Sequence, residues 1–153
     1  MQTTLVILKP SALQRNLVGE VITRFEKKGL QLVGMKMTNL SQSVLEEHYS
    51  HLKDRPIFKR IMDSMMVSPV IVVAVRGLEA VNVVRVMTGA TNGRYALPGT
   101  IRGDFSMSVQ ENIVHASDSP ETAETELKRF FNKGEIFDYK QLTFANLYAN
   151  DEI

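Results

Sequence analysis

Histidine and carboxylate side chains in the stretch NIVHASDSPETAETE, residues 112–126, could together do nucleophilic chemistry. His115 follows a short apolar run and is surrounded by small residues, which leave room for a substrate. A neutral imidazole has a nucleophilic nitrogen near neutral pH, and it can hold a phosphoryl group as a phosphoramidate. Glu126 borders the apolar face of the following helix and could hold the second ring nitrogen. From these residues alone, a structural role for His115 and an exposed position for Glu126 both stay open.

The other two histidines are weaker candidates for chemistry. His48 lies beside an apolar helical stripe, a position more typical of a structural residue. His51 falls off that stripe, and we expect its side chain to be exposed. The chain contains no cysteine, which excludes disulfides, zinc–thiolate sites and thiol catalysis.

Basic and hydroxyl side chains offer an anion site in a chain without a glycine-rich phosphate loop. Neither a Walker sequence nor a GxGxxG segment after a strand is present, so side chains would have to bind any phosphate. Guanidinium groups suit phosphate oxygens because they form bidentate, charge-assisted hydrogen bonds. The candidates are Lys9, Arg85, Thr91, Arg94 and Arg102. Any one of them, taken singly, could instead be a solvated surface charge.

Length and composition fit an ordinary globular domain. The chain has 153 residues, of which 44% are hydrophobic and 23% charged, and its formal net charge is +1. This balance does not call for a nucleic acid or an anionic membrane as partner. No apolar run approaches the roughly 20 residues that span a bilayer, and residues 1–10 lack the pattern of a secretory signal. We therefore expect a single domain over residues 1–153 in a cytoplasmic protein.

Hydrophobic periodicity predicts the elements that would position these residues. Strands are predicted at 3–10, 30–39, 70–75 and 112–117, and helices at 17–29, 41–52, 53–69, 77–89 and 119–131. Alternation slips near Gly34, as a bulge would produce, and Ser43 with Glu46 fits a capping box. Residues 89–112 show no sustained period and are predicted to be an irregular loop, while 132–153 form an aromatic tail.

The order of these elements matches a split βαβ pattern, βαββαβ, in which a helical layer covers one face of a four-stranded antiparallel sheet. For the chain as a whole we expect the α/β class, as a ferredoxin-like α+β sandwich with helices on its faces and an irregular C-terminal tail. Sensor domains and RNA-binding domains also use this sheet, so the fold leaves the function open. RNA-binding sheets expose aromatic side chains on their central strands, whereas these strands are aliphatic.

The run NIVHASDS resembles the active-site signature of nucleoside diphosphate kinases, Asn-x-x-His-(Gly/Ala)-Ser-Asp-Ser. Further segments stand in the order and spacing of that family: LKP at 8–10, RNLVGEVITRFEKKGLQLVG at 15–34, EHYSHLKDRP at 47–56, SPVIVV at 68–73, RVMTGATN at 85–92 and PGTIRGDF at 98–105. The likeness implies transfer of the γ-phosphate of a nucleoside triphosphate, mainly ATP, to nucleoside diphosphates. It implies a ping-pong reaction through a phosphohistidine, which maintains the NTP and dNTP pools.

The resemblance also implies roles for individual residues. His115 would be the nucleophile, with Glu126 on its other nitrogen, and Ser117 and Tyr49 would help to place the ring. Nucleotide contacts are implied for Lys9, Ile57, Phe58, Arg85, Thr91, Arg102, Val109 and Asn112. Mg²⁺ would arrive on the nucleotide phosphates, with no ligand directly from the protein. The family forms homo-oligomers, either tetramers or hexamers, and neither a membrane nor a nucleic acid is needed as a partner.

Three departures from the family pattern bear on these expectations. Ser11-Ala12 stands where the family usually has Asp-Gly or Asp-Ala, and Gly93 replaces the usual proline, which is expected to loosen the loop. Ile57 stands where the family stacks a phenylalanine on the base. It keeps an apolar clamp with Val109 but loses stacking energy of about 1 kcal/mol. We therefore expect weaker nucleotide binding with the chemistry intact.

Overall fold

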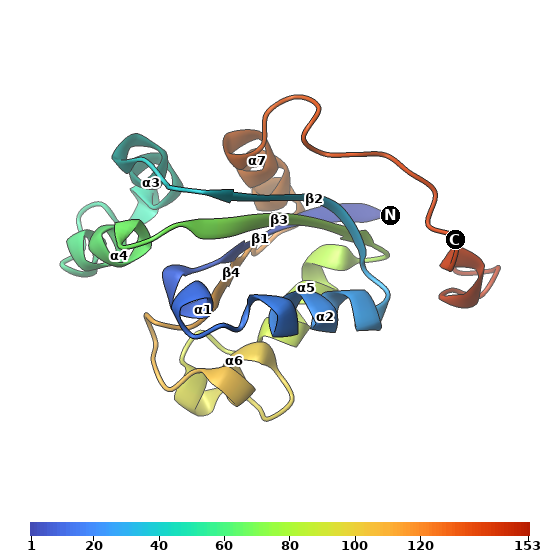
Figure 1. Ribbon diagram of the computed structural model, residues 1–153, viewed down its shortest axis with the longest axis horizontal. Helices are drawn as coiled ribbons and strands as arrows, with labels where there is room; N and C mark the ends of the chain where they lie inside the picture. Colours follow the sequence, from blue (N-terminus) through green and yellow to red (C-terminus); the bar gives the residue numbers. More distant parts are fainter.

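A four-stranded antiparallel sheet forms the centre of the computed structural model, which describes residues 1–153 (Figure 1). Its strands lie in the order β2-β3-β1-β4, the order of a ferredoxin-like fold. The strands are β1 (Gln2–Leu8), β2 (Gln31–Thr38), β3 (Val70–Gly77) and β4 (Val114–Ala116). The helices are α1 (Pro10–Gln14), α2 (Val18–Lys28), α3 (Gln42–His48), α4 (Ile57–Met66), α5 (Ala80–Thr88), α6 (Ile101–Phe105) and α7 (Pro120–Phe130). Three 3₁₀ turns complete the chain, namely η1 (Ser50–Leu52), η2 (Gly93–Tyr95) and η3 (Phe144–Asn146).

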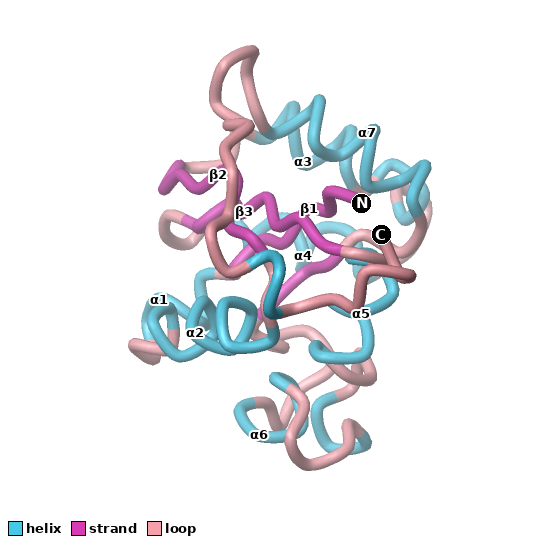
Figure 2. Tube along the Cα trace, turned by 90° about the vertical axis from the view of Figure 1, so that its right-hand side faces the viewer, coloured by secondary structure: helices cyan, strands magenta, loops and turns pink.

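Helices cover both faces of the sheet, as expected for the sandwich and in contrast to a single helical layer (Figures 1 and 2). Successive strand residues point to opposite faces, so Val6 and Leu8 enter one apolar cluster while Leu5 and Ile7 enter the other. Helices α2, α5 and α6 contribute side chains to the first cluster. Helices α3, α4 and α7 contribute to the second. None of the helices is both long enough and apolar enough to cross a membrane.

Several local signals are confirmed and one is wrong. Gly29 ends α2 in the left-handed conformation, at φ 98°. The pairing of β2 with β3 shifts register between Leu32 and Gly34, as the slipped alternation predicted. The predicted capping box is wrong, because the hydroxyl of Ser41, and not that of Ser43, caps α3 by accepting a hydrogen bond from the Val44 amide.

Residues 89–112 are less irregular than predicted, because they contain η2 and α6. Such short helices leave too few residues to show a period in the sequence. Gly93 fastens this loop, contrary to the expected loosening. Its amide donates a hydrogen bond to the Ser108 carbonyl at 3.1 Å, which a proline could not do. A Cβ atom at this position would lie 2.3 Å from the Ser106 carbonyl oxygen, so the backbone also leaves no room for a side chain.

The C-terminal tail runs back along β2 and ends near the start of β1 and the end of β3 (Figure 1). The amide of Phe137 donates to the Val33 carbonyl at 2.8 Å, and the Tyr139 hydroxyl donates to the Leu32 carbonyl at 2.5 Å. The Phe137 and Tyr139 side chains themselves remain more than half exposed. The tail therefore packs on its own chain through polar contacts and keeps two aromatic rings at the surface.

Candidate active site

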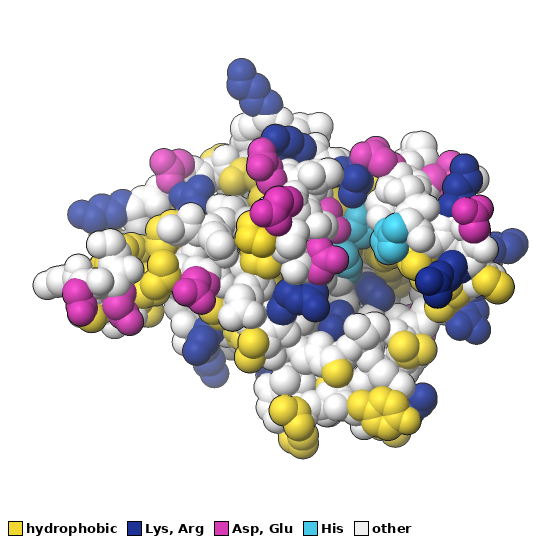
Figure 3. All heavy atoms as spheres, turned by 180° about the vertical axis from the view of Figure 1, so that it is seen from behind, with side chains coloured by type: hydrophobic (Ala, Val, Ile, Leu, Met, Phe, Trp, Pro, Cys, Tyr) yellow, Lys and Arg dark blue, Asp and Glu magenta, His cyan; other side chains and the backbone are white.

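A cleft of about 500 Å³ lies between the α3–α4 insert and the loop of residues 89–112. Nine of the residues singled out from the sequence line it: Lys9, Tyr49, Ile57, Arg85, Thr91, Arg102, Val109, Asn112 and His115. In Figure 3 the histidines lie at the margin of a hollow in which lysine and arginine side chains are visible. Segments distant in sequence thus bring cations, apolar side chains and one imidazole into a single cleft.

Strand β4 carries His115 into this cleft. His115 lies opposite Ile7 of β1, so the strand that bears it is joined to the centre of the sheet. The preceding Ile113 is fully buried and has φ 72°, which is a strained conformation for a β-branched residue. Its carbonyl accepts a hydrogen bond from the Lys9 amide at 2.9 Å. The core and this bond hold the strained turn that directs β4 toward the cleft.

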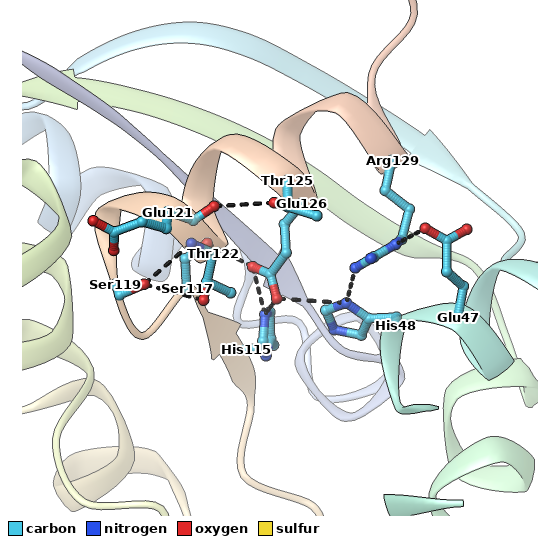
Figure 4. Close-up of polar contacts among 10 residues, drawn as sticks. All are labelled: Glu47, His48, His115, Ser117, Ser119, Glu121, Thr122, Thr125, Glu126 and Arg129. Carbon is cyan, nitrogen blue, oxygen red and sulfur yellow. Dashed lines mark hydrogen bonds and ion pairs between the residues drawn. The ribbon is translucent and has the colours of Figure 1, made fainter. Parts of the chain in front are cut away.

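Glu126 holds one nitrogen of the His115 ring (Figure 4). Its two carboxylate oxygens lie 3.0 and 3.1 Å from Nε2 of His115, and the Ser117 hydroxyl donates to Oε2 at 2.5 Å. Burial by itself would raise the pKa of Glu126, but the hydrogen bonds from His115 and Ser117 hold that pKa below its ordinary value. An ionised carboxylate only accepts, so Nε2 carries the proton and Nδ1 keeps a free lone pair.

The start of α7 sets the position of Glu126. Ser119 caps the helix by accepting from the Thr122 amide at 3.1 Å, and Pro120 occupies the first helical position, as the sequence predicted. Glu126 then falls on the buried side of the second turn, where it faces back toward β4 (Figure 4). The short segment between His115 and Glu126 is thus a strand end, a cap and a helical turn.

His48 supports the imidazole from the side. Its side chain is only 1% exposed, and its ring lies edge-on to the His115 ring at 4.5 Å between centroids. Burial, followed by the nearby His115, lowers the pKa of His48 to about 3. A neutral ring forms no ion pair, so the 3.5 Å approach of Nδ1 to Glu126 is a contact without charge attraction. Nη1 of Arg129 donates to that Nδ1 at 3.3 Å, which places the proton of His48 on Nε2.

This lowered pKa predicts a measurable loss of stability in mild acid. An unfolded histidine takes up a proton below pH 6.5, whereas folded His48 resists it down to about 3. Stability therefore rises with pH through this window and is lost as the pH falls from 6.5. The unfolding free energy of both proteins should fall from pH 7 to pH 5. We expect this fall to be smaller in His48→Gln than in wild type, by on the order of 2 kcal/mol. Urea unfolding at several pH values measures this, with exposed His51→Gln as control, and parallel curves for wild type and His48→Gln would contradict it.

Lys9 and Asn112 hold each other at the inner wall of the cleft. Nζ of Lys9 donates to the Asn112 side-chain oxygen at 2.6 Å, and the amide nitrogen of Asn112 donates to the carbonyls of Thr91 and Val109. Burial, together with the charge of Arg102, lowers the pKa of Lys9 to about 8. The Lys9 ammonium group is therefore already largely removed from water. It would lose little hydration if a ligand oxygen bound to it.

Arg102 has a structural task besides any contact with a ligand. Its three guanidinium nitrogens donate to the carbonyls of Gly89, Asn112 and Val114 at 2.7, 3.3 and 2.8 Å. Burial, and then the charge of Arg85, lowers its pKa to about 10, so it still carries a charge at neutral pH. Arg102 thus ties both ends of the loop and the start of β4 together. Arg85 lies in the same cleft with an exposed side chain.

Four predicted residues lie elsewhere than in the cleft lining. Glu126 and the fully buried Ser117 stand behind the His115 ring. Phe58 packs on the apolar cluster of the α3, α4 and α7 face, and Arg94 donates to the Met107 carbonyl at 3.2 Å. Tyr49 lines the cleft, but its ring contacts His48, at 4.6 Å between centroids, so it acts on His115 through His48.

Sequence reasoning missed several lining residues. Arg55 and Asp118 lie inside segments that resemble the family motifs, so their place in those motifs was an available signal. Thr88 lies in such a segment as well, whereas Ile61, Ser64 and Gln110 also line the cleft and had no such signal. Arg55 adds a further cation, and Asp118 adds an exposed carboxylate at the mouth beside His115.

A neutral imidazole with one nitrogen held by a carboxylate, facing a cleft rich in cations, is the arrangement of a phosphotransferase with a histidine nucleophile. Comparison with known proteins agrees. The family model for nucleoside diphosphate kinase matches residues 2–136. A nucleoside diphosphate kinase of Parabacteroides distasonis is 65% identical over 152 residues, 99% of each chain. One of Pyrococcus abyssi is 50% identical over 141 residues, 90% of this chain and 89% of that one.

A solved structure shows the same fold. The halophilic nucleoside diphosphate kinase of Halobacterium salinarum in complex with CDP has a TM-score of 0.95 and 35% identity, covering 97% of this chain and 99% of that one. This chain belongs to the nucleoside diphosphate kinase family. It is a phosphotransferase that passes the γ-phosphate of a nucleoside triphosphate to nucleoside diphosphates through a phosphohistidine. Kinases of this family bind nucleotides and generally use a divalent metal.

Proposed function

We propose that Nδ1 of His115 is the atom that carries the phosphoryl group. The observation that supports this most directly is the Glu126 carboxylate on Nε2, because it leaves the lone pair of Nδ1 available. In the first half-reaction that lone pair forms an N–P bond, and the bond from phosphorus to the β–γ bridging oxygen breaks. The diphosphate leaves with the electron pair. In the second, a terminal oxygen of the acceptor diphosphate attacks the phosphorus and the N–P bond breaks, while the Nε2 proton stays toward Glu126.

The cations of the cleft are proposed to stabilise this transfer. Charge accumulates on the oxygens of the moving phosphoryl group, and fixed donors stabilise it most when they are in place beforehand. We assign phosphate contacts to Arg85, Thr91 and Arg102, which line the cleft together. The paired Lys9 and Asn112 are assigned to the sugar hydroxyls, with the 3′-hydroxyl close to the reacting phosphate.

Mg²⁺ is proposed to enter as part of the nucleotide substrate. Mg²⁺ prefers oxygen ligands and usually binds through substrate phosphates, water and one or two carboxylates. The cleft lining fits that mode, because it presents cations and a single carboxylate, Asp118, at its mouth. When bound, the ion would shield phosphate charge. The residues that hold the phosphates against it remain Arg85, Thr91 and Arg102.

Phosphorylation of the purified chain by radiolabelled ATP tests the proposed nucleophile. We expect one acid-labile, base-stable label per chain, which added nucleoside diphosphate removes. Mass spectrometry of the labelled peptide should place the phosphoryl group on His115. A label on another residue would refute the assignment, and no label at all would refute the phosphohistidine route.

Ile57 provides a test of base binding. The half-buried Ile57 lines the cleft together with Val109. Ile57→Phe should tighten nucleotide binding about fivefold, since an aromatic ring restores about 1 kcal/mol of stacking on the base. Calorimetric titration with a diphosphate measures the change. Val67→Phe, at an exposed position outside the cleft, is the control, and an unchanged affinity for Ile57→Phe would contradict the expectation.

Larger-scale properties stay proposals. We propose that residues 1–153 form a single nucleoside diphosphate kinase domain that assembles into a homo-oligomer, either a tetramer or a hexamer. The exposed Phe137 and Tyr139 rings support subunit packing, and light scattering would give the number of subunits. The cytoplasmic location, and activity without a nucleic acid or membrane partner, stay predictions from the sequence.

A further inference from the structure

A second cavity, of about 450 Å³, lies behind the His115 ring. Its lining differs in character from that of the nucleotide cleft, because it contains all three histidines of the chain. Four carboxylates also line it: Glu47, Asp118, Glu121 and Glu126. His115 belongs to both linings, as do Tyr49, Ala116 and Asp118, so the two cavities adjoin at this ring. Imidazole and carboxylate together are the ligand set that Zn²⁺ takes from proteins.

Three of these side chains converge closely enough to share one ion (Figure 4). One ligand atom from each of His48, His115 and Glu126 lies within 4.8 Å of the others. Nε2 of His115 is 3.0 Å from Oε1 of Glu126, and Nδ1 of His48 is 3.5 Å from the same oxygen. Ligands of a tetrahedral Zn²⁺ with bonds of about 2.0–2.1 Å stand about 3.3 Å apart. The cluster therefore needs only small shifts to reach that geometry.

The Nε2–H group of His48 lacks an acceptor, so the ring is incompletely matched to the surroundings that it has in this tautomer. Nε2 of His48 has no hydrogen-bond partner, although the side chain is 1% exposed. Leaving such a group unpaired costs free energy, so native structures rarely tolerate it without a reason. The lone pair of Nδ1, which faces Glu126 at 3.5 Å, is the one that an ion would engage.

Arg129 competes for the same position. Its Nη1 lies 3.3 Å from Nδ1 of His48. The Arg129 guanidinium therefore already supplies this nitrogen with a positive charge and a hydrogen-bond donor. Its Nε donates to Glu47 at 2.8 Å, and the Glu47 side chain is 64% exposed. The guanidinium group can therefore turn outward with Glu47 when an ion enters. Metal binding would have to break the contact between Arg129 and His48, which lowers the affinity for the ion.

We propose that His48, His115 and Glu126 bind a Zn²⁺-class ion, and that this binding excludes phosphoryl transfer. The metal would take the Nε2 lone pair of His115, which moves the ring proton to Nδ1. A protonated Nδ1 has no lone pair for attack on phosphorus. The nucleotide cleft on the other side of the ring is not occupied by the ion, so nucleotide would still bind. The exclusion rests on the proposed role of His115, whereas the metal binding does not.

Titration of the nucleotide-free full chain with Zn²⁺, and with Co²⁺ as a spectroscopic probe, tests the binding. We expect one ion per chain and tetrahedral Co²⁺ absorption bands that Zn²⁺ abolishes. His48→Gln should weaken binding ~10-fold or more, since even residues that only support metal ligands have effects of that size. Arg129→Met should tighten binding, because it removes the competing cation, and His51→Gln should leave it unchanged.

The variants separate a built site from loose binding at surface histidines. Equal losses in His48→Gln and His51→Gln, or no binding by wild type, would overturn the proposal. Glu126→Gln, which keeps the side-chain volume, should weaken binding as well and replaces His48→Gln if that variant does not fold. Zn²⁺-loaded protein, freed of excess ion, should also form the phosphohistidine label about tenfold more slowly or worse, and EDTA should restore the rate. Binding without slower labelling would overturn the exclusion and leave the nucleophile assignment to the labelling experiment.

Discussion

His115→Ala should abolish nucleoside diphosphate kinase activity, with a loss on the order of 10⁴-fold or more in kcat/KM. The reason is that a ping-pong route has no alternative when its covalent carrier is removed. Alanine cannot hold a phosphoryl group, and Glu126 behind it is directed at the ring and not at the cleft. A coupled assay with ATP and a diphosphate acceptor measures the loss.

His51→Ala is the matched control for this substitution, because His51 is exposed and lies outside the nucleotide cleft. It should retain near wild-type turnover. Nucleotide binding by His115→Ala should also survive, since the cations and the apolar clamp remain. Residual turnover within a hundredfold of wild type would mean that another group accepts the phosphoryl group, and the proposed nucleophile would be wrong.

Arg102→Met should lower both stability and activity, in contrast to substitution of the exposed Arg85. Arg102 is buried and donates to three backbone carbonyls, so its removal takes this donor from Gly89 and Val114, while the Asn112 carbonyl keeps the Val114 amide. Unsatisfied buried groups cost 1–3 kcal/mol each, and partial access of water reduces the sum, so we expect a loss of about 3 kcal/mol. Urea unfolding of the purified variant measures this loss.

Arg85→Met separates the effect of losing a positive charge in the cleft from the effect of losing structural hydrogen bonds. Arg85 lines the same cleft, but it is exposed and its side chain makes no hydrogen bond to the protein. Its loss should weaken phosphate contacts and turnover while the unfolding free energy stays within about 0.5 kcal/mol of wild type. If Arg102→Met were as stable as Arg85→Met, the three carbonyl contacts would not be holding the loop.

Elements with a full hydrophobic period could be predicted, and the shortest ones could not. The four strands followed from short apolar runs and, for β2, from alternation, and the long helices followed from apolar stripes. Helices α1 and α6 have five residues each, which is too short for a stripe to show. The cap of α3 was assigned to Ser43 in place of Ser41 because both precede an apolar run and only the backbone turn distinguishes them.

The candidate site was predictable where motif and chemistry coincide in a short segment. The distance from His115 to Glu126 follows from a strand end, a cap and a turn of helix, all visible in the sequence. The carbonyl contacts of Arg102 could not be predicted from the sequence, since they depend on how the loop folds over β4. His48 was interpreted as structural, and it is buried, but its contact with His115 requires α3 to pack beside β4.

The pairing of β1 with β4 also determines when, during folding, the candidate active site is assembled. Lys9 follows β1 and bonds to Asn112 just before β4, so residues 103 positions apart in the chain meet at the catalytic end of the sheet. Such long-range contacts close large loops and form slowly compared with local helices. A growing or partly folded chain, however helical, does not yet have His115, the proposed nucleophile, in place. Phosphohistidine formation during refolding would therefore report the completion of the sheet.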